Sequence, residues 1–416
     1  MRVINMLWRW LTNTKAIEKS SGELETAFFE SVYRVTYLVG FSTSDNGLLY
    51  LIYSTVVKIS LCLVLLSEFW YMCTLANTLD ELAGSINIVV IHCITCFRYA
   101  NMIIHKDVYK KLAQAMESPY FDISTSKRKK ITEYWAQKNE KYLKTLLLIG
   151  NSTLAAWFIN PLIDGVDRNI IGGIYLPFSY DTPCRYAVSY LMVIVSFAYI
   201  SYSVMLSDLT MQAHLIHLVC QFNVLVDCFK NIINDCQGPD DLENNNMLVI
   251  NNKFKERYVK RLGDLIEQHR SILSLAMKLR YILSAPLLGQ LVASGILICF
   301  VGYQATTTAA ASLTQGLTSI LYLGYNLFAF YIICRWCQEI NTQSQNVGEA
   351  VYCSGWEQGT SIIPKVRSSL LLIIGRANKP LIFSAGGMYN LSLQSYTSLV
   401  KTSYSALTVL LRVRQN

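Results

Sequence analysis

The sequence predicts an all-α membrane protein with seven transmembrane helices. Hydrophobic residues make up 52% of the 416 positions, charged residues make up only 15%, and the mean hydropathy is +0.31. A soluble globule of this size carries more charge on its surface. Long apolar runs recur along the chain, and lysine and arginine are distributed unevenly between them. The sequence therefore excludes a soluble protein.

Seven runs approach the twenty apolar residues that a helix needs to cross a bilayer. They are 48–69, 84–105, 143–163, 186–211, 286–306, 316–338 and 384–413. The segment before the first run mixes charged and aromatic residues and has neither a continuous apolar core nor a small-residue cleavage site. We therefore expect this segment to remain on the mature chain.

The distribution of lysine and arginine between the runs predicts the orientation. One set of connections holds 27 of these residues and the alternate set holds two. The rich connections are 1–47, 106–142, 212–285 and 339–380, and the poor ones are 70–83, 164–185 and 307–315. By the positive-inside rule the rich set is cytoplasmic. With seven spans, the N-terminus is then cytoplasmic and the C-terminus extracellular, which is the reverse of a G-protein-coupled receptor.

The long inner connections have helical periodicity. Apolar residues recur at helical spacing between 222 and 282, with a break expected at 236–246, where turn formers and acidic residues gather. The pattern of 345–351, followed by Trp356, indicates a further helix before the last run. Helices are therefore expected to extend below the membrane and to pack on each other or on another subunit.

These patterns divide the chain into four regions. They are a cytoplasmic N-terminal segment (1–47), six transmembrane helices with their cytoplasmic extensions (48–338), a cytoplasmic anchor region (339–380) and the last helix with a short extracellular end (381–416).

The last run differs from the others because it is amphipathic. Its polar residues follow a spacing of alternating four and three, which places them on one helical face. They are Gln394, Ser398, Lys401, Ser405, Thr408 and Arg412. Leucines occupy the positions between them, and the run is long enough to cross a bilayer. This pattern is typical of a pore-lining helix, and the alternative is a helix packed in a bundle whose hydroxyls bond neighbouring helices.

The cysteines and histidines give no pattern of a metal or catalytic site. Cys334 and Cys337 have the CxxC spacing, but no second pair completes a zinc site, so we interpret them as structural. Only Cys73 and Cys184 lie clearly on the predicted outer side, where they are the candidates for a disulfide.

Motifs for nucleotide binding, zinc proteolysis and serine hydrolysis are absent from the sequence. We therefore predict no enzymatic activity, no metal and no cofactor. The basic run 127–130 lies beside the membrane, where it is a topology determinant near anionic lipid rather than a nucleic-acid site.

The C-terminal residues resemble a known family. The sequence reads Glu349-Ala-Val-Tyr352, then Trp356, then LLLIIGRANKPLIFSAGGMYNLSLQSYTSLVKTSYSALTVLLRVRQN. This order is similar to the C-terminal signature of insect odorant receptors, and the length, the predicted topology and the long inner loops agree with that family. The chain departs from the family at 375–380, where a Gln-Arg-Pro is usual, and at 406–407, where Ala-Leu replaces Tyr-Phe.

The resemblance implies an odorant-gated, non-selective cation channel. Each subunit of a tetramer with the odorant co-receptor would contribute its last helix to a central pore in the plasma membrane of olfactory sensory neuron dendrites. The implied gate lies at Val409 and Val413, beside Ser405, Thr408 and Arg412. A ring of apolar side chains stops ions by dewetting. The alternative is that these valines only pack against neighbouring helices.

The resemblance also implies a pocket for a small volatile molecule among the second to sixth helices, in the outer half of the subunit. The candidate lining residues are Asn87, Ile91, Thr153, Trp157, Tyr190, Ile194, Phe197, Tyr322 and Tyr325. Trp157, Tyr322 and Tyr325 match positions of the family pocket. Affinity there comes mainly from burial of apolar surface. The alternative is that these aromatic residues belong to the core of the bundle.

Two other receptor classes remain as alternatives. A gustatory receptor of the related channel family shares the fold and topology but has a different last-helix signature. A G-protein-coupled receptor needs an extracellular N-terminus, and the sequence has no DRY-like triplet after the third run and no NPxxY in the seventh. The co-receptor itself carries a longer second inner loop and a different C-terminal ending.

Overall fold

Six helices of the computed structural model have the length and apolar composition of membrane spans, and each matches one of the first six predicted runs, with 84–105 extending one residue past its helix. They are α4 (Leu48–Thr74), α5 (Leu79–Ile104), α7 (Ser126–Ile163), α8 (Pro183–Lys230), α10 (Asn252–Thr308) and α11 (Leu313–Tyr352). The structure describes residues 12–20, 22–75, 79–163, 170–171, 173–237, 252–308, 313–358 and 360–415. The seventh helix, α13 (Leu393–Gln415), is more polar and is not among the six apolar helices.

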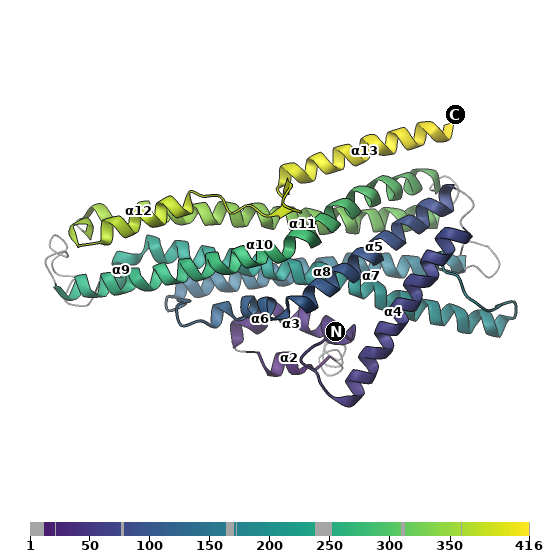
Figure 1. Ribbon diagram of the computed structural model, residues 1–416, viewed down its shortest axis with the longest axis horizontal. Helices are drawn as coiled ribbons and strands as arrows, with labels where there is room; N and C mark the ends of the chain where they lie inside the picture. Colours follow the sequence, from purple (N-terminus) through teal and green to yellow (C-terminus); the bar gives the residue numbers. More distant parts are fainter. Residues whose placement is uncertain are drawn as a thin grey trace.

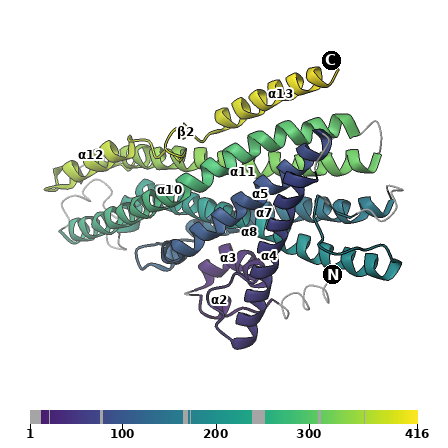
Figure 2. The same cartoon turned by 45° about the vertical axis from the view of Figure 1, so that its right-hand side comes forward.

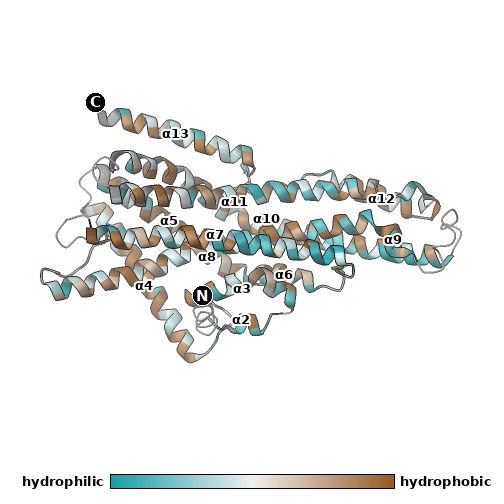
Figure 3. Ribbon diagram, turned by 180° about the vertical axis from the view of Figure 1, so that it is seen from behind, coloured by the Kyte–Doolittle hydropathy of each residue, from teal (hydrophilic) through white to brown (hydrophobic). Residues whose placement is uncertain are grey.

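The longest helices extend far beyond a bilayer core. Helix α8 has 48 residues and α10 has 57, so at about 1.5 Å per residue they measure about 70 Å and about 85 Å, against a core of about 30 Å. Their far ends lie together with α9 (Ile232–Cys236) and α12 (Val366–Ala377) at one end of the elongated bundle (Figure 1). Figure 3 shows this end as the more hydrophilic one. The predicted extension of helices out of the membrane is therefore confirmed.

Helix α8 forms the centre of the bundle and α4 lies at its edge. Nearly every residue of α8 between Ser203 and Phe229 is buried, as expected for a helix that is covered on all sides. Helix α4, by contrast, exposes many large apolar side chains, including Leu49, which is 85% exposed. In a membrane protein such a surface faces lipid tails.

The N-terminal helices pack under the bundle. Helices α2 (Lys15–Glu18) and α3 (Glu23–Leu38) precede α4, and α6 (Lys106–Ala113) with the short η1 (Ala115–Glu117) follows α5. Phe29 of α3 packs against His214 of α8 with ring centroids 4.7 Å apart. The Asn139 amide of α7 donates to the carbonyl of Phe28 at 2.8 Å. These contacts fix α3 against the central helices.

Arg128, which is buried, forms ion pairs that connect the extended ends of the helices. The Arg128 guanidinium on α7 lies 2.5 Å from Asp122, 3.1 Å from Asp227 and 2.6 Å from Asp235. Arg261 of α10 also pairs with Asp122 and Asp235. One arginine therefore connects the chain before α7 with α8 and α9, and the second brings α10 to the same cluster.

The prediction of a separate helix from residues 345–351 and Trp356 is wrong. Residues 345–351 are the end of α11, because Val347, Ala350 and Val351 continue its buried face, no proline interrupts it, and Gly348 packs closely against Ala377 of α12. Trp356 lies in the short η4 (Trp356–Gln358), which is followed by η5 (Thr360–Ile362). The separate helix is α12. The predicted boundary between 338 and 339 thus falls inside a continuous helix. Of the predicted break at 236–246, residues 238–246 lie outside the described residues.

The last helix begins later than predicted. Residues from 384 to 390 form a hairpin of β1 (Ser384–Ala385) and β2 (Tyr389–Asn390), because Gly386 and Gly387 adopt φ of +59° and +75° at its turn. The Gly386 N–H donates to the Ser284 carbonyl of α10 at 2.9 Å, and the Leu393 N–H donates to Gln338 Oε1 of α11 at 2.9 Å. The start of α13 is therefore anchored to both neighbouring helices.

Candidate functional site

A small apolar cavity of about 70 Å³ lies between α5, α7, α8 and α11. Its lining residues are Ile88, Ile91, His92, Gly150, Thr153, Leu154, Trp157, Phe197, Ser201, Val204, Met205, Tyr322 and Tyr325. Trp157 is the centre of the aromatic wall, with ring centroids 5.6 Å from Phe197 and 6.3 Å from Tyr322. The apolar, aromatic lining suits a small, largely apolar molecule, whereas the volume is well below the roughly 300–1,000 Å³ of typical ligand pockets, so a ligand must widen the cavity.

Six of the nine residues predicted for a ligand pocket line this cavity. They are Ile91, Thr153, Trp157, Phe197, Tyr322 and Tyr325. Helical spacing explains why these residues lie together: Thr153 and Trp157 are four residues apart on α7, and Tyr322 and Tyr325 are three apart on α11. Each pair therefore presents its side chains to the same side of its helix.

Asn87, Tyr190 and Ile194 do not line the cavity. Asn87 precedes Ile91 by one turn of α5, and Ile194 and Tyr190 precede Phe197 by one and two turns of α8. The Tyr190 hydroxyl donates to the Phe158 carbonyl at 2.6 Å, so it is part of the packing between α7 and α8. Periodicity predicts which face a residue occupies but not how far along the helix a cavity extends.

A buried acid and histidine stand at the cavity wall, and the sequence prediction did not include them in the pocket. His92 lines the cavity, and its Nδ1 lies 2.7 Å from Oε2 of Glu68 on α4. Their side chains are 4% and 2% exposed. The signal was present in the sequence, because an ionisable residue inside a membrane span is expensive and usually marks a functional site. The sequence pattern does not single out Glu68, because it stands one residue from the end of the run 48–69.

A second buried pair of ionisable residues lies beside the cavity. The Tyr325 hydroxyl donates to Asp208 Oδ2 at 3.0 Å. Arg98 of α5 donates to Asp208 Oδ1 at 2.8 Å and to the Ser207 hydroxyl at 2.9 Å. The two charges neutralise each other, which a low-dielectric interior requires. Tyr325, a cavity residue on α11, is thereby connected to α8 and α5.

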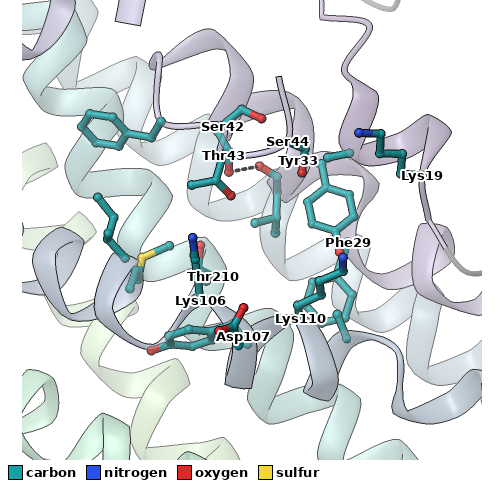
Figure 4. A pocket seen from close by; sticks show the side chains of 18 of the residues that line it. Lys19, Phe29, Tyr33, Ser42, Thr43, Ser44, Lys106, Asp107, Lys110 and Thr210 are labelled. Carbon is teal, nitrogen blue, oxygen red and sulfur yellow. Dashed lines mark hydrogen bonds between the residues drawn. The ribbon is translucent and has the colours of Figure 1, made fainter. Parts of the chain in front are cut away.

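A larger cavity of about 420 Å³ lies beside α3, α5 and α6, and none of the predicted pocket residues lines it. Figure 4 shows Lys19, Lys106 and Lys110 around it, together with Phe29 and Tyr33. Burial and the hydrogen bond that the Tyr33 hydroxyl donates to Glu25, at 2.7 Å, raise the pKa of Tyr33 well above its usual value. This mixed polar lining fits an apolar volatile less well than the aromatic cavity does.

Helix α13 lies along one side of the bundle, as both ribbon views show (Figures 1 and 2). Its inner side packs on α10, where the Ser403 hydroxyl donates to the Gly295 carbonyl at 3.2 Å. Leu399 faces Gly295, and Leu407 faces Gly302 seven residues further on. Small residues at the contact let the two helices approach closely.

The predicted polar face of α13 points away from the bundle. Gln394, Ser398, Lys401, Ser405 and Arg412 are exposed, and Thr408 is partly exposed. Val409 is 60% exposed. The Ser405 hydroxyl donates to the Lys401 carbonyl at 3.0 Å and the Thr408 hydroxyl to the Ser405 carbonyl at 2.7 Å, so both are satisfied within the helix. The side chain of Val413 lies outside the described residues.

The structure does not contain the predicted disulfide. Cys73 in the last turn of α4 and Cys184 in the first turn of α8 are both exposed free thiols. The prediction placed both cysteines in outer loops, whereas both stand on helices that fix the directions of their side chains.

Comparison with known proteins gives one consistent family. A family model described as 7tm Odorant receptor matches residues 78–404. Odorant receptor 13a of Drosophila melanogaster is 28% identical over 160 residues, which are 36% of this chain and 38% of that relative. Odorant receptor 10 of Aedes albopictus is 25% identical over 330 residues, which are 75% of this chain and 80% of that relative.

The fold is also that of a solved insect olfactory receptor. The structure of OR5 from Machilis hrabei has a TM-score of 0.77, with 16% identity, over 93% of this chain and 98% of that one. The structure of the same receptor in complex with eugenol gives the same TM-score. The chain is thus a multi-pass membrane protein with seven helices of the olfactory receptor arrangement. Because the family model covers most of its length, the chain belongs to the seven-transmembrane odorant receptor family of insects.

Proposed function

We propose that this chain is the odorant-binding subunit of a ligand-gated, non-selective cation channel. In this proposal it forms a tetramer with odorant co-receptor subunits in the plasma membrane of olfactory sensory neuron dendrites. Each subunit contributes α13 to a central pore that conducts cations. The N-terminus is cytoplasmic and the C-terminus extracellular.

The observation that carries the proposal is the unpartnered polar face of α13. Helix α13 packs on α10 with one side only and exposes Ser405 and Val409 on the other. Within a bilayer, polar groups avoid lipid and face either protein or water. A ring of such faces around an axis gives a water-filled pore, in which Val409 supplies an apolar constriction.

The aromatic cavity is the proposed odorant site. It lies among α5, α7, α8 and α11, and α11 also holds the start of α13 through Gln338. A ligand that binds the open arrangement more tightly than the closed one shifts the population toward opening. The anchorage of α13 to α10 and α11 connects the aromatic cavity mechanically to the pore.

Electrophysiology tests the proposal. Cells expressing this chain together with an insect odorant co-receptor are exposed to a panel of volatile molecules while membrane current is recorded. We expect at least one volatile to evoke a cation current that persists when G-protein signalling is blocked with a non-hydrolysable GDP analogue. A current that disappears under that block contradicts the channel function.

The orientation is tested separately. An epitope at the N-terminus is expected to become accessible to antibody only after permeabilisation, and an epitope after residue 416 is expected to be accessible in intact cells. Staining of the N-terminal epitope in intact cells contradicts the proposed topology.

A further inference from the structure

We propose that the Glu68–His92 pair presents one N–H donor to the aromatic cavity and thereby selects ligands that carry a hydrogen-bond acceptor, namely small ketones, aldehydes and esters. This inference rests on the proposed function, because it assigns the chemical class of ligand to the same cavity. It concerns two residues that helical periodicity and family resemblance did not assign to the pocket.

The geometry leaves one nitrogen of His92 free to meet a ligand. Nδ1 is occupied by Glu68 Oε2 at 2.7 Å. The ring stands edge-on to Phe197 on the cavity wall, with centroids 6.1 Å apart and an interplanar angle of 73°. Nε2 makes no hydrogen bond among the described residues, and it is not enclosed by protein atoms, whereas Oε1 of Glu68 is enclosed.

The protonation state of the Glu68–His92 pair determines whether Nε2 donates or accepts a hydrogen bond. The pair has two states without net charge. In the first, a carboxylate faces an imidazolium, and both ring nitrogens carry hydrogen. In the second, a protonated Glu68 donates to Nδ1, and the neutral ring carries its hydrogen on Nε2. Both states therefore place an N–H at Nε2, and the free nitrogen is a donor in either one.

Of the two charged states, a protonated Glu68 with an imidazolium again places an N–H at Nε2, and the other has a carboxylate beside a neutral ring and a net charge of minus one. Burying such a charge in a membrane bundle is costly. The cost is higher here because Oε1 of Glu68 has no hydrogen-bond partner among the described residues. This is the only state in which Nε2 accepts a hydrogen bond, so a ligand that can only donate is disfavoured.

The other polar groups of the cavity do not impose the same selection. The Thr153 hydroxyl donates to the Ile149 carbonyl at 2.9 Å, and the Tyr325 hydroxyl donates to Asp208. The hydroxyls of Ser201 and Tyr322 can donate or accept, so they tolerate both ligand types. Because Ser201 and Tyr322 can also donate to a carbonyl, His92 differs from them in offering a donor and no acceptor, so it is the group in the lining that discriminates acceptors from ligands that can only donate.

Matched ligand pairs test the inference on the purified chain in lipid nanodiscs. Cyclopentanone is compared with methylenecyclopentane, and acetophenone with α-methylstyrene, because in each pair a CH₂ group replaces the carbonyl oxygen at almost unchanged shape. Binding is measured as ligand-induced thermal stabilisation. We expect at least one ketone to bind about tenfold more tightly than its alkene, the effect of one good hydrogen bond.

Variants show whether His92 causes the preference. His92→Phe removes the donor but leaves Glu68 buried without a partner, so the double variant Glu68→Leu/His92→Phe removes the whole pair and spares the fold. We expect the ketone preference to fall to within twofold in the double variant. Thr95→Val is the control, because the Thr95 hydroxyl bonds its own helix at Ile91 and does not line the cavity.

The outcomes separate this inference from the proposed channel function. Equal affinity of ketone and alkene in the native chain, absence of binding by both pairs, or a preference that persists in the double variant overturns the inference. Binding is measured without recording current. If the native chain prefers ketones but gives no volatile-evoked current with the co-receptor, the inference is upheld and only the channel function is overturned.

Discussion

At the scale of single residues, the ionisable groups buried between the helices are the most consequential. Arg98 and Asp208 form an ion pair with side chains 2% and 5% exposed, and Tyr325 adds a hydrogen bond from the cavity. The sequence predicted Tyr325 in a pocket and showed Arg98 and Asp208 within apolar runs, but it did not pair them. Pairing between distant helices depends on their relative rotation and depth, which the pattern along one chain does not encode.

Removing one partner of this pair should destabilise the protein. Asp208→Asn leaves the Arg98 charge buried and uncompensated, so we expect the free energy of unfolding to fall by about 3–5 kcal/mol. Thermal unfolding of the purified chain measures this. The double variant Arg98→Met/Asp208→Leu serves as the control and should recover most of the loss; a double variant as unstable as Asp208→Asn contradicts the account.

Asp122 gives a pH prediction outside the membrane. Burial alone raises the pKa of this carboxyl, but hydrogen bonds from Ser124 and the charges of Arg261 and Arg128 outweigh burial and lower the pKa below its ordinary value of 3.8. The stabilisation is therefore fully present above the ordinary pKa and is lost as the pH falls through the lowered one.

We expect acidification from about pH 5 to about pH 3 to reduce the thermal stability of the native chain more than that of Asp122→Asn, which has no carboxyl to protonate. The comparison uses midpoints of thermal unfolding at both pH values. Equal losses in the two proteins contradict a stabilising role of the Asp122 carboxylate.

At the scale of elements, the contact of α13 with α10 depends on glycine. A Cβ added to Gly302 would stand 3.0 Å from Leu407 Cδ2, so a larger side chain there must displace the Leu407 side chain or push α13 outward. The helix itself was predictable from its amphipathic spacing. The hairpin before it was not predicted, although adjacent glycines at 386 and 387 are a known turn signal, because its strands are only two residues long.

Gly302→Val tests this contact. We expect the variant to bind ligand within about threefold of the native affinity but to lose most ligand-evoked current, since α13 is displaced while the aromatic cavity is unchanged. Gly263→Ala on the same helix is the matched control, because nothing lies within 4 Å of a Cβ added there. Normal current in Gly302→Val contradicts a close α10–α13 contact in the working channel.

At the scale of the whole molecule, composition and helical periodicity predicted the class of fold and an apolar run within each of the six apolar helices. Apolar runs report burial in lipid directly, so their positions follow from the sequence alone. Periodicity also predicted that helices extend beyond the membrane, but not that α8 and α10 run continuously through 48 and 57 residues. The Arg128 cluster was not predicted, because it joins residues that are more than a hundred positions apart.

The central claim is that water and ions reach one side of α13 when the channel is open. Cysteines are placed singly at Ser405 and Val409 on the exposed side and at Leu399 on the side that packs on α10. A water-soluble thiol reagent is applied to the heteromeric channel during ligand stimulation, and the native chain corrects for its own cysteines. We predict that Ser405→Cys and Val409→Cys react and that the current falls, whereas Leu399→Cys does not react; the opposite pattern, or no reaction at either exposed position, would contradict the account.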